Sequence, residues 1–260
     1  MTSRRLATGL KLATASALAL AALALPRIAR ADDESGVLDS RHRRYESPQN
    51  FALEFRFAPY RPRIDEAPEI KGTPYKDTFG TLQRLEIAIE IDWQALRIPH
   101  VGTLGPGLSA GYTSMGDKAK LKSDPTKSSA EDTTLEIYPL YGVVVFRADA
   151  VMRELHLPLV PYAKMGLGMA FWRASNSLGT SSADNVSGKG HTVGAQFAVG
   201  ISLHLNEFDN AASRNLDNSV GINHTYAFFE LMSAQLTGLG QTHALFVGAN
   251  TWVTGLAFEM

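Results

Sequence analysis

The sequence predicts an all-β protein, a transmembrane antiparallel up-and-down β-barrel of eight strands behind a cleaved signal peptide. Residues 85–93 alternate without a break between apolar side chains and small or charged ones, and residues 193–203 repeat this pattern. A period of two describes a strand with one apolar and one polar face. The chain also begins with an apolar leader and ends in a further alternating segment, at residues 250–260.

The first 31 residues have the three parts of a secretory signal peptide. Arg4, Arg5 and Lys11 form a positive region, residues 12–25 are apolar and uncharged, and residues 29–31 read Ala-Arg-Ala. This order is typical of a leader that is removed after a small residue. The apolar run is too short to cross a bilayer comfortably. We therefore expect residues 1–31 to be a signal peptide.

The expected mature chain divides into a short tail and a barrel. Residues 32–49 are polar, charged and too few for a domain, so we expect a flexible periplasmic segment, with the barrel in residues 50–260. The leader holds five of the 25 basic residues and none of the 26 acidic ones, so the mature formal charge is 20 − 26 = −6. This balance does not favour nucleic acid as a partner. The absence of cysteine excludes disulfides and thiolate sites.

Eight segments show the alternation of a strand. Pro106 interrupts the third, where neighbouring glycines indicate a bulge. A ten-stranded barrel is the alternative if residues 234–249 form a hairpin of their own. Long polar connections, such as residues 113–133, alternate with shorter ones, as in outer-membrane barrels. The eight segments are residues 51–57, 81–93, 101–112, 134–146, 159–172, 191–205, 223–233 and 250–260.

The apolar faces of these strands are expected to contact lipid. A soluble barrel or sandwich would show the same alternation, but its water-facing positions would carry larger polar side chains than the glycine and alanine found here, for example at Gly166, Ala198 and Gly255. In hydrocarbon a sheet satisfies its backbone groups only by closing into a barrel. The predicted lipid-facing residues are Leu85, Ile87, Ile89, Ile91, Trp93, Phe197, Val199, Ile201 and Leu203.

Two segments resemble parts of known outer-membrane barrels. Residues 255–260 resemble the C-terminal strand that the barrel-assembly machinery reads, although the chain ends in Met260 where that family usually has phenylalanine. Residues 158–168 are similar to a segment of uncharacterised small outer-membrane barrels of Gram-negative bacteria. The resemblance implies a monomeric barrel of the OmpA or OmpX size class in the cell outer membrane. The resemblance also implies the assembly machinery as a partner, and the apolar strand faces predict outer-membrane lipid as another, with lipopolysaccharide as a further candidate.

The polar faces carry charges that must pair inside a barrel, because an isolated buried charge is costly. We expect Arg84 and Lys164 to be the cationic partners. The simpler interpretation is a structural salt-bridge network that fills the lumen. The alternative is a narrow path for polar solutes or protons. The predicted network is Arg84, Glu86, Glu90, Glu136, Lys164 and Glu230, and Glu54, Arg56 and Asp92 share the inward phase.

No set of residues assembles into a catalytic or metal site, so we predict neither an enzyme nor a cofactor. His224 and Thr225 are adjacent and would face opposite sides of a strand, and no pair of histidines has ligand spacing. Lysines at positions 118–127 make one loop basic, which is typical of a solvated loop, and contact with lipopolysaccharide or a surface partner is the alternative. We expect a structural or interaction role through external loops. A narrow channel for small polar solutes and a lipid-modifying enzyme are the alternatives.

Overall fold

The computed structural model describes residues 50–121, 124–177, 179–183, 186–206, 221–241 and 244–260. The predicted signal peptide and the predicted periplasmic segment lie outside the described residues. No described helix is both long enough and apolar enough to span a membrane.

Eight long strands form one closed antiparallel sheet, which confirms the predicted fold class. The order around the barrel is β10-β11-β12-β1-β2-β4-β5-β6, and pairing between β6 and β10 closes it. A short β3 (Leu96–Ile98) pairs with β4, and β7 (Gly179–Thr180) pairs with β6. The eight strands are β1 (Phe51–Tyr60), β2 (Arg84–Trp93), β4 (Gly102–Leu121), β5 (Asp124–Arg147), β6 (Leu159–Asn176), β10 (Lys189–His204), β11 (His224–Gln235) and β12 (Asn250–Glu259).

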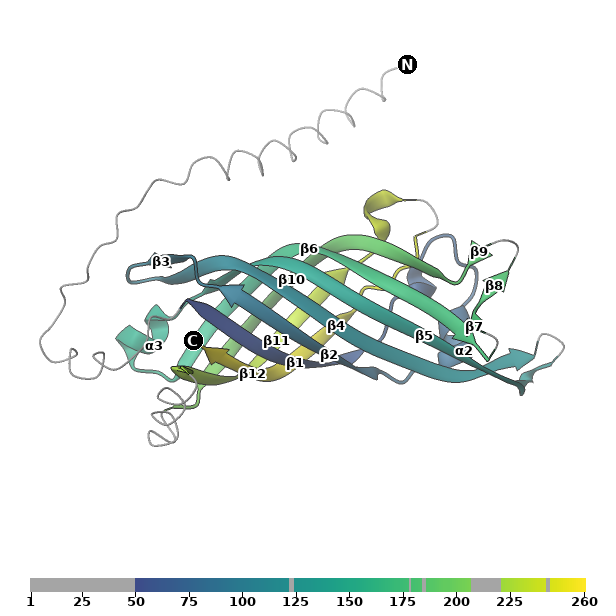
Figure 1. Cartoon of the computed structure of the whole chain (residues 1–260), viewed down its shortest axis with the longest axis horizontal. Helices are drawn as coiled ribbons and strands as arrows, with labels where there is room; N and C mark the ends of the chain where they lie inside the picture. Colours follow the sequence, from purple (N-terminus) through teal and green to yellow (C-terminus); the bar gives the residue numbers. More distant parts are fainter. Residues whose placement is uncertain (1–49, 122–123, 178, 184–185, 207–220, 242–243) are drawn as a thin grey trace, which may run out of the picture. The chain divides into compact units, whose positions relative to one another are not determined.

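The two ends of the barrel differ (Figure 1). One end carries β3, the helix α3 (Ala150–Leu155) and the start and end of the barrel sequence, where the Asn50 N–H donates to the Met260 carbonyl over 3.1 Å. The opposite end, which we call the outer end, carries the longer connections. These include η2 (Ile64–Glu66), α2 (Pro74–Phe79), η3 (Gly238–Gly240) and the small hairpin of β8 (Ser182–Ala183) and β9 (Val186–Ser187).

Apolar side chains from the connections close the outer mouth of the lumen. Tyr75 and Phe79 of α2 pack with Met115 and neighbouring apolar residues of the strands. The Asp65 carboxylate accepts the backbone N–H groups of Tyr75 and Lys76 over 2.8 and 3.0 Å, which satisfies the first turn of this short helix. A buried apolar plug therefore covers the luminal charges from this side.

The connection between β11 and β12 also enters the mouth. Leu236 and Val247 are fully buried there, and the Tyr60 hydroxyl donates to the Val247 carbonyl. No described residue between 236 and 249 belongs to a strand. The ten-stranded alternative is thus not adopted, because the apolar residues of this segment fill the mouth instead of pairing as a hairpin.

The prediction of a polar loop at residues 113–133 is wrong. β4 continues to Leu121 and β5 begins at Asp124, with pairs from Thr113–Ile137 to Lys118–Asp132. This extension of the two strands could not be predicted from the sequence, because residues 113–133 are mostly polar and show no alternation of apolar and polar residues. At Pro106 the strand changes partner from β2 to β3, which accommodates the missing N–H.

The two faces of the barrel have opposite chemistry. Eight of the nine side chains predicted to face lipid are exposed on the outer surface, and Leu203 is half-buried. Ile89, in the middle of β2, is 51% exposed, whereas its neighbour Glu90 is fully buried. The apolar surface therefore lies outside and the charges lie inside.

The predicted facing of β5 is wrong. The inward position predicted for Glu136 would put Ile137 and other odd-numbered residues on the lipid side. Ile137, Tyr141 and Val143 are instead buried in the lumen, and Tyr138 and Leu140 are exposed. The strand is apolar on both faces, so alternation could not assign its sides. Pairing with β6 decides the matter, because Val145 lies directly opposite Lys164 and must share its inward face.

Candidate functional site

Four carboxylates and three cations form an ion-pair cluster inside the barrel. Lys164 lies at its centre: its Nζ is 2.7 Å from Glu54 Oε2 and 3.6 Å from Glu230 Oε2, and it also contacts Glu90 Oε1. Each of these side chains is at most 2% exposed. We call the set the luminal ion cluster; it contains Glu54, Arg56, Glu90, Asp92, Arg147, Lys164 and Glu230.

Two arginines complete the cluster. Arg56 binds Glu54 Oε2 over 2.6 Å and Glu230 Oε1 over 2.5 Å. Arg147 Nη2 lies 2.7 Å from Glu54 Oε1 and 2.5 Å from Asp92 Oδ2. Such charge-assisted hydrogen bonds offset the cost of removing the charges from water. Removing any one cation would leave at least two carboxylates short of a partner.

The cluster crosses the whole lumen. Glu54 lies on β1 and Lys164 on β6, and these strands stand four places apart in a ring of eight. Strands with that spacing face each other across a barrel, so the contact between the two side chains spans its width. The Tyr162 ring packs against Arg147 and Lys164, at 5.8 and 5.2 Å from its centroid. Side chains therefore fill the interior at this level, as is usual for eight strands.

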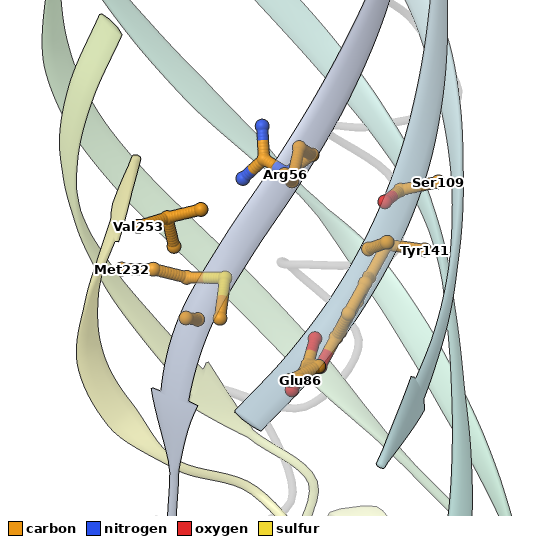
Figure 2. A pocket seen from close by; sticks show the side chains of 8 residues that line it. Arg56, Glu86, Ser109, Tyr141, Met232 and Val253 are labelled. Atoms are coloured by element: carbon orange, nitrogen blue, oxygen red, sulfur yellow. The ribbon is translucent and has the colours of Figure 1, made fainter. Parts of the chain in front are cut away.

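Glu86 is buried beside the cluster but outside its ion pairs. Its Oε2 atom has no hydrogen-bond partner among the described residues. It lines a cavity of about 10 Å³ together with Ser109, Tyr141 and Arg56, as Figure 2 shows. A space of this size, with polar groups of Glu86, Ser109 and Tyr141 in its lining, holds about one water molecule. The cavity is small.

Two predicted members of the network lie elsewhere. Glu136 is on the outer face of β5, where its carboxylate accepts a hydrogen bond from the Tyr112 hydroxyl over 3.3 Å. Glu136 was predicted to face the lumen because the two faces of β5 were assigned the wrong way round. Arg84 lies half-buried at the outer end of β2, opposite Tyr60, and forms no ion pair within the described part of the chain. The structure brings Glu90, Lys164 and Glu230 together as ion partners.

Sequence reasoning missed Arg147, which was placed in the connection after the fourth segment. It is the last residue of β5 and shares the inward phase of Val143 and Val145. The signal was present, because an arginine two residues beyond an inward valine also faces inward. It was hidden by the same facing error that misplaced Glu136.

Three carboxylates of the cluster have the spacing of a cation site. Ligand atoms of Glu54, Glu90 and Asp92 lie within 4.8 Å of one another. Lys164 and Arg147 already occupy oxygens of all three. A divalent ion there would face three cationic side chains at close range, so the donor set favours ion pairing over metal binding.

Two histidines meet at the end of the barrel opposite the mouth. His204 Nε2 lies 3.0 Å from His224 Nδ1, and the His204 ring packs against Tyr226. They stand on neighbouring strands at diagonal positions, a proximity that their separation of 20 residues did not suggest. The side chains of His224 and its neighbour Thr225 lie on opposite faces of β11, as expected for adjacent strand residues.

A closed antiparallel sheet with ion pairs inside and an apolar belt outside reverses the arrangement of a soluble barrel. In fold, the chain is a small outer-membrane β-barrel. Its eight strands and antiparallel neighbour pairing match the smallest class of membrane barrels. Exposed aromatic side chains stand on the outer surface of this outer-membrane barrel fold, among them Trp93 at the end of β2, Tyr112 of β4 and Phe171 of β6.

No protein-family model and no curated protein matches the chain. Among solved structures, it is similar to the crystal structure of Ail, the attachment invasion locus protein of Yersinia pestis, in complex with the heparin analogue sucrose octasulfate. That match has 11% identity and a TM-score of 0.41, and it covers 83% of this chain and 99% of Ail.

Two further solved barrels are similar. The N-terminal β-barrel domain of Pseudomonas aeruginosa OprF has 11% identity and a TM-score of 0.39, with 82% of this chain and 100% of that domain covered. Outer membrane protein W of Escherichia coli has 14% identity and a TM-score of 0.37, with 83% of this chain and 100% of that protein covered.

Proposed function

We propose that this protein resides in the bacterial outer membrane and has a structural or interaction role, carried out by its outer end. The observation that carries the proposal is the luminal ion cluster, which joins β1 to β6 across the barrel. Because these side chains fill the interior at this level, we expect the interior to hold the barrel together. Function then falls to the outer surface and to the connections at the outer end.

Membrane insertion is supported by the outer face. Its exposed apolar residues form a belt along β2, β6 and β10, including Leu85, Leu167 and Val199. Water would not support such a surface on a folded monomer, since large contiguous apolar patches lead to association. The export leader expected at residues 1–31 directs the chain out of the cytoplasm, and it can then fold only where lipid covers the belt.

The outer end offers an edge for a partner. β4 pairs with β2 only up to Thr113, and from Ser114 to Leu121 it pairs with β5 alone among the described strands. The backbone of this protruding hairpin therefore has a free edge outside the membrane. Free edges accept an added strand from another protein. The interaction part of the proposal centres on this hairpin.

The purified protein should show heat-modifiable gel mobility and should fractionate with outer membranes. In planar bilayers we expect no single-channel steps above the baseline, because the ion cluster and the apolar mouth block the lumen. A porin reconstituted in parallel serves as the positive control. Steady conductance by the folded protein would contradict a filled interior.

A narrow channel for small polar solutes is the second candidate, favoured by the cavity beside Glu86. Lys164→Gln distinguishes the two functions, because the change removes the charge that any ion crossing the barrel would meet. A filled barrel with this substitution should show no single-channel conductance, whereas a channel should change its conductance or its ion selectivity. Gel mobility of the variant before and after heating shows whether it is folded.

The proposal includes no catalysis. A lipid-modifying barrel needs a nucleophile and a base in contact, and His224 and Thr225 face opposite sides of β11. Membrane lipids of a deletion strain should therefore have the same acyl composition as those of the parent strain. A lipid species that appears only in the deletion strain would favour the enzyme alternative.

A further inference from the structure

The lipid-facing surface contains an apolar recess near the middle of the barrel. Ala110 of β4 and Gly142 of β5 line it, and the small alanine side chain and the absence of one at glycine leave space between larger neighbours. The volume is about 600 Å³, and the walls include Ile89, Leu108, Leu167 and Met169. A membrane surface usually presents a continuous row of large apolar side chains, so a recess here has room for a hydrocarbon chain.

An aromatic row lies directly above the recess, toward the outer end. Tyr138 of β5 stands opposite Phe171 of β6, and Phe171 stands opposite His191 of β10. Tyr112 of β4 packs against Tyr138, with ring centroids 5.1 Å apart. Aromatic side chains gather where hydrocarbon meets the polar headgroups. The row therefore marks the outer boundary of the apolar core.

Two cations lie one row further out. Arg173 of β6 pairs directly with Lys189 of β10, and both side chains are exposed. Neither forms an ion pair within the described part of the barrel. Like charges at directly opposite positions destabilise a sheet. Glu136 of β5 lies directly opposite Arg173. Its carboxylate accepts a hydrogen bond from the Tyr112 hydroxyl. An anion that binds both cations would remove this repulsion.

The three features lie along the same strand and face. Met169 in the recess and Arg173 in the cationic row are four residues apart on β6, which corresponds to about 13 Å at ~3.3 Å per residue. This order, with hydrocarbon space first, then aromatic rings, then paired cations, matches a lipid that carries phosphate on its headgroup.

We propose that this face binds one molecule of lipid A, the phosphorylated anchor of lipopolysaccharide, with an acyl chain in the recess and a phosphate between Arg173 and Lys189. The occupant belongs to the outer leaflet because Arg173 lies near the outer end of β6 and Lys189 begins β10 at the same end. The inference rests on the proposed location in the outer membrane. It places the lipid contact on β6 and β10, two strands away from Lys118 of β4.

The headgroup contact is tested by native mass spectrometry of the purified barrel mixed with equal amounts of lipid A, dephosphorylated lipid A and phosphatidylglycerol. The wild-type protein should retain lipid A preferentially. Arg173→Gln with Lys189→Gln should lower this retention about tenfold or more, since each tenfold corresponds to only ~1.4 kcal/mol. Lys71→Gln with Lys76→Gln removes the same charge from exposed positions of the mouth and should leave retention unchanged.

The acyl contact is tested by filling the recess. A Cβ at Gly142 would meet only the Leu108 side chain, at 3.9 Å, so Gly142→Leu should fold. It should lower lipid A retention, whereas Ala163→Leu, on the same outer face of β6 but outside the recess, should not.

Three outcomes would overturn the inference: equal retention of the three lipids, equal retention by the wild-type and Gln variants, or a dimer that Gly142→Leu disperses. The last outcome would assign the recess to a second copy of the chain. Heat-modifiable mobility and outer-membrane fractionation of the same samples test the proposed location separately. A barrel that passes both but binds no lipid A refutes this inference alone.

Discussion

Replacing Lys164 with methionine is expected to lower the free energy of unfolding by about 3–5 kcal/mol, the usual cost of removing one partner from a buried ion pair. The Lys164 side chain is fully buried and contacts Glu54, Glu90 and Glu230. Methionine has a similar length but leaves these carboxylates without their shared cation. Urea unfolding in lipid vesicles, followed by gel mobility, measures the change.

Arg153→Met is the matched control for this prediction. Arg153 lies 3.5 Å from Asp149 at the surface, and its side chain is 38% exposed, so the loss should be about 0–1 kcal/mol. Adding Glu90→Gln to Lys164→Met should recover part of the stability, because one uncompensated charge is removed. Equal effects of Lys164→Met and Arg153→Met would show that the luminal ion cluster does not stabilise the barrel.

Ile89→Lys is expected to destabilise the inserted barrel by about 2–4 kcal/mol, the cost of a lysine near the bilayer midplane. Ile89 is exposed on the outer face of β2, between Phe55 of β1 and Ala110 of β4. A water-facing isoleucine would tolerate this change. The experiment therefore tests membrane insertion directly, by unfolding in vesicles and by the yield of heat-modifiable protein.

Leu85→Lys provides the comparison. Leu85 is also exposed on the outer face of β2, but it lies near the strand's outer end, where a lysine reaches the headgroups and should cost about 0–1 kcal/mol. Similar losses at the two positions, or a folded Ile89→Lys protein that is soluble without detergent, would refute the placement of this belt in lipid.

The sequence predicted strands best where the two faces differ in chemistry. β2 alternates isoleucine with glutamate, so its location and the inward position of Glu86 and Glu90 could be read directly. β5 is apolar on both faces through the membrane and polar on both faces beyond it. Its facing and its length were therefore missed, and with them the luminal position of Arg147.

The sequence predicted that the lumen contains paired charges, but it did not predict which residues form the pairs. Alternation indicates that a side chain faces inward, and burial requires that its charge be paired. Which cation meets which carboxylate depends on strands that lie opposite each other in the closed ring, and no local pattern encodes that relation. Lys164 was foreseen as a cation of the network, whereas the partnership of Arg147 with Glu54 and Asp92 was not.

The sequence by itself determined that this protein is built from strands with one apolar and one polar face, because a period of two places neighbouring side chains on opposite faces. Only the tertiary structure decided that eight strands close the ring with their apolar faces outward, that ion pairs cross the lumen, and that η2, α2, Leu236 and Val247 close its mouth. It also placed the recess below the cation pair Arg173 and Lys189. These features depend on strand order, register and closure, which bring together residues far apart in the chain.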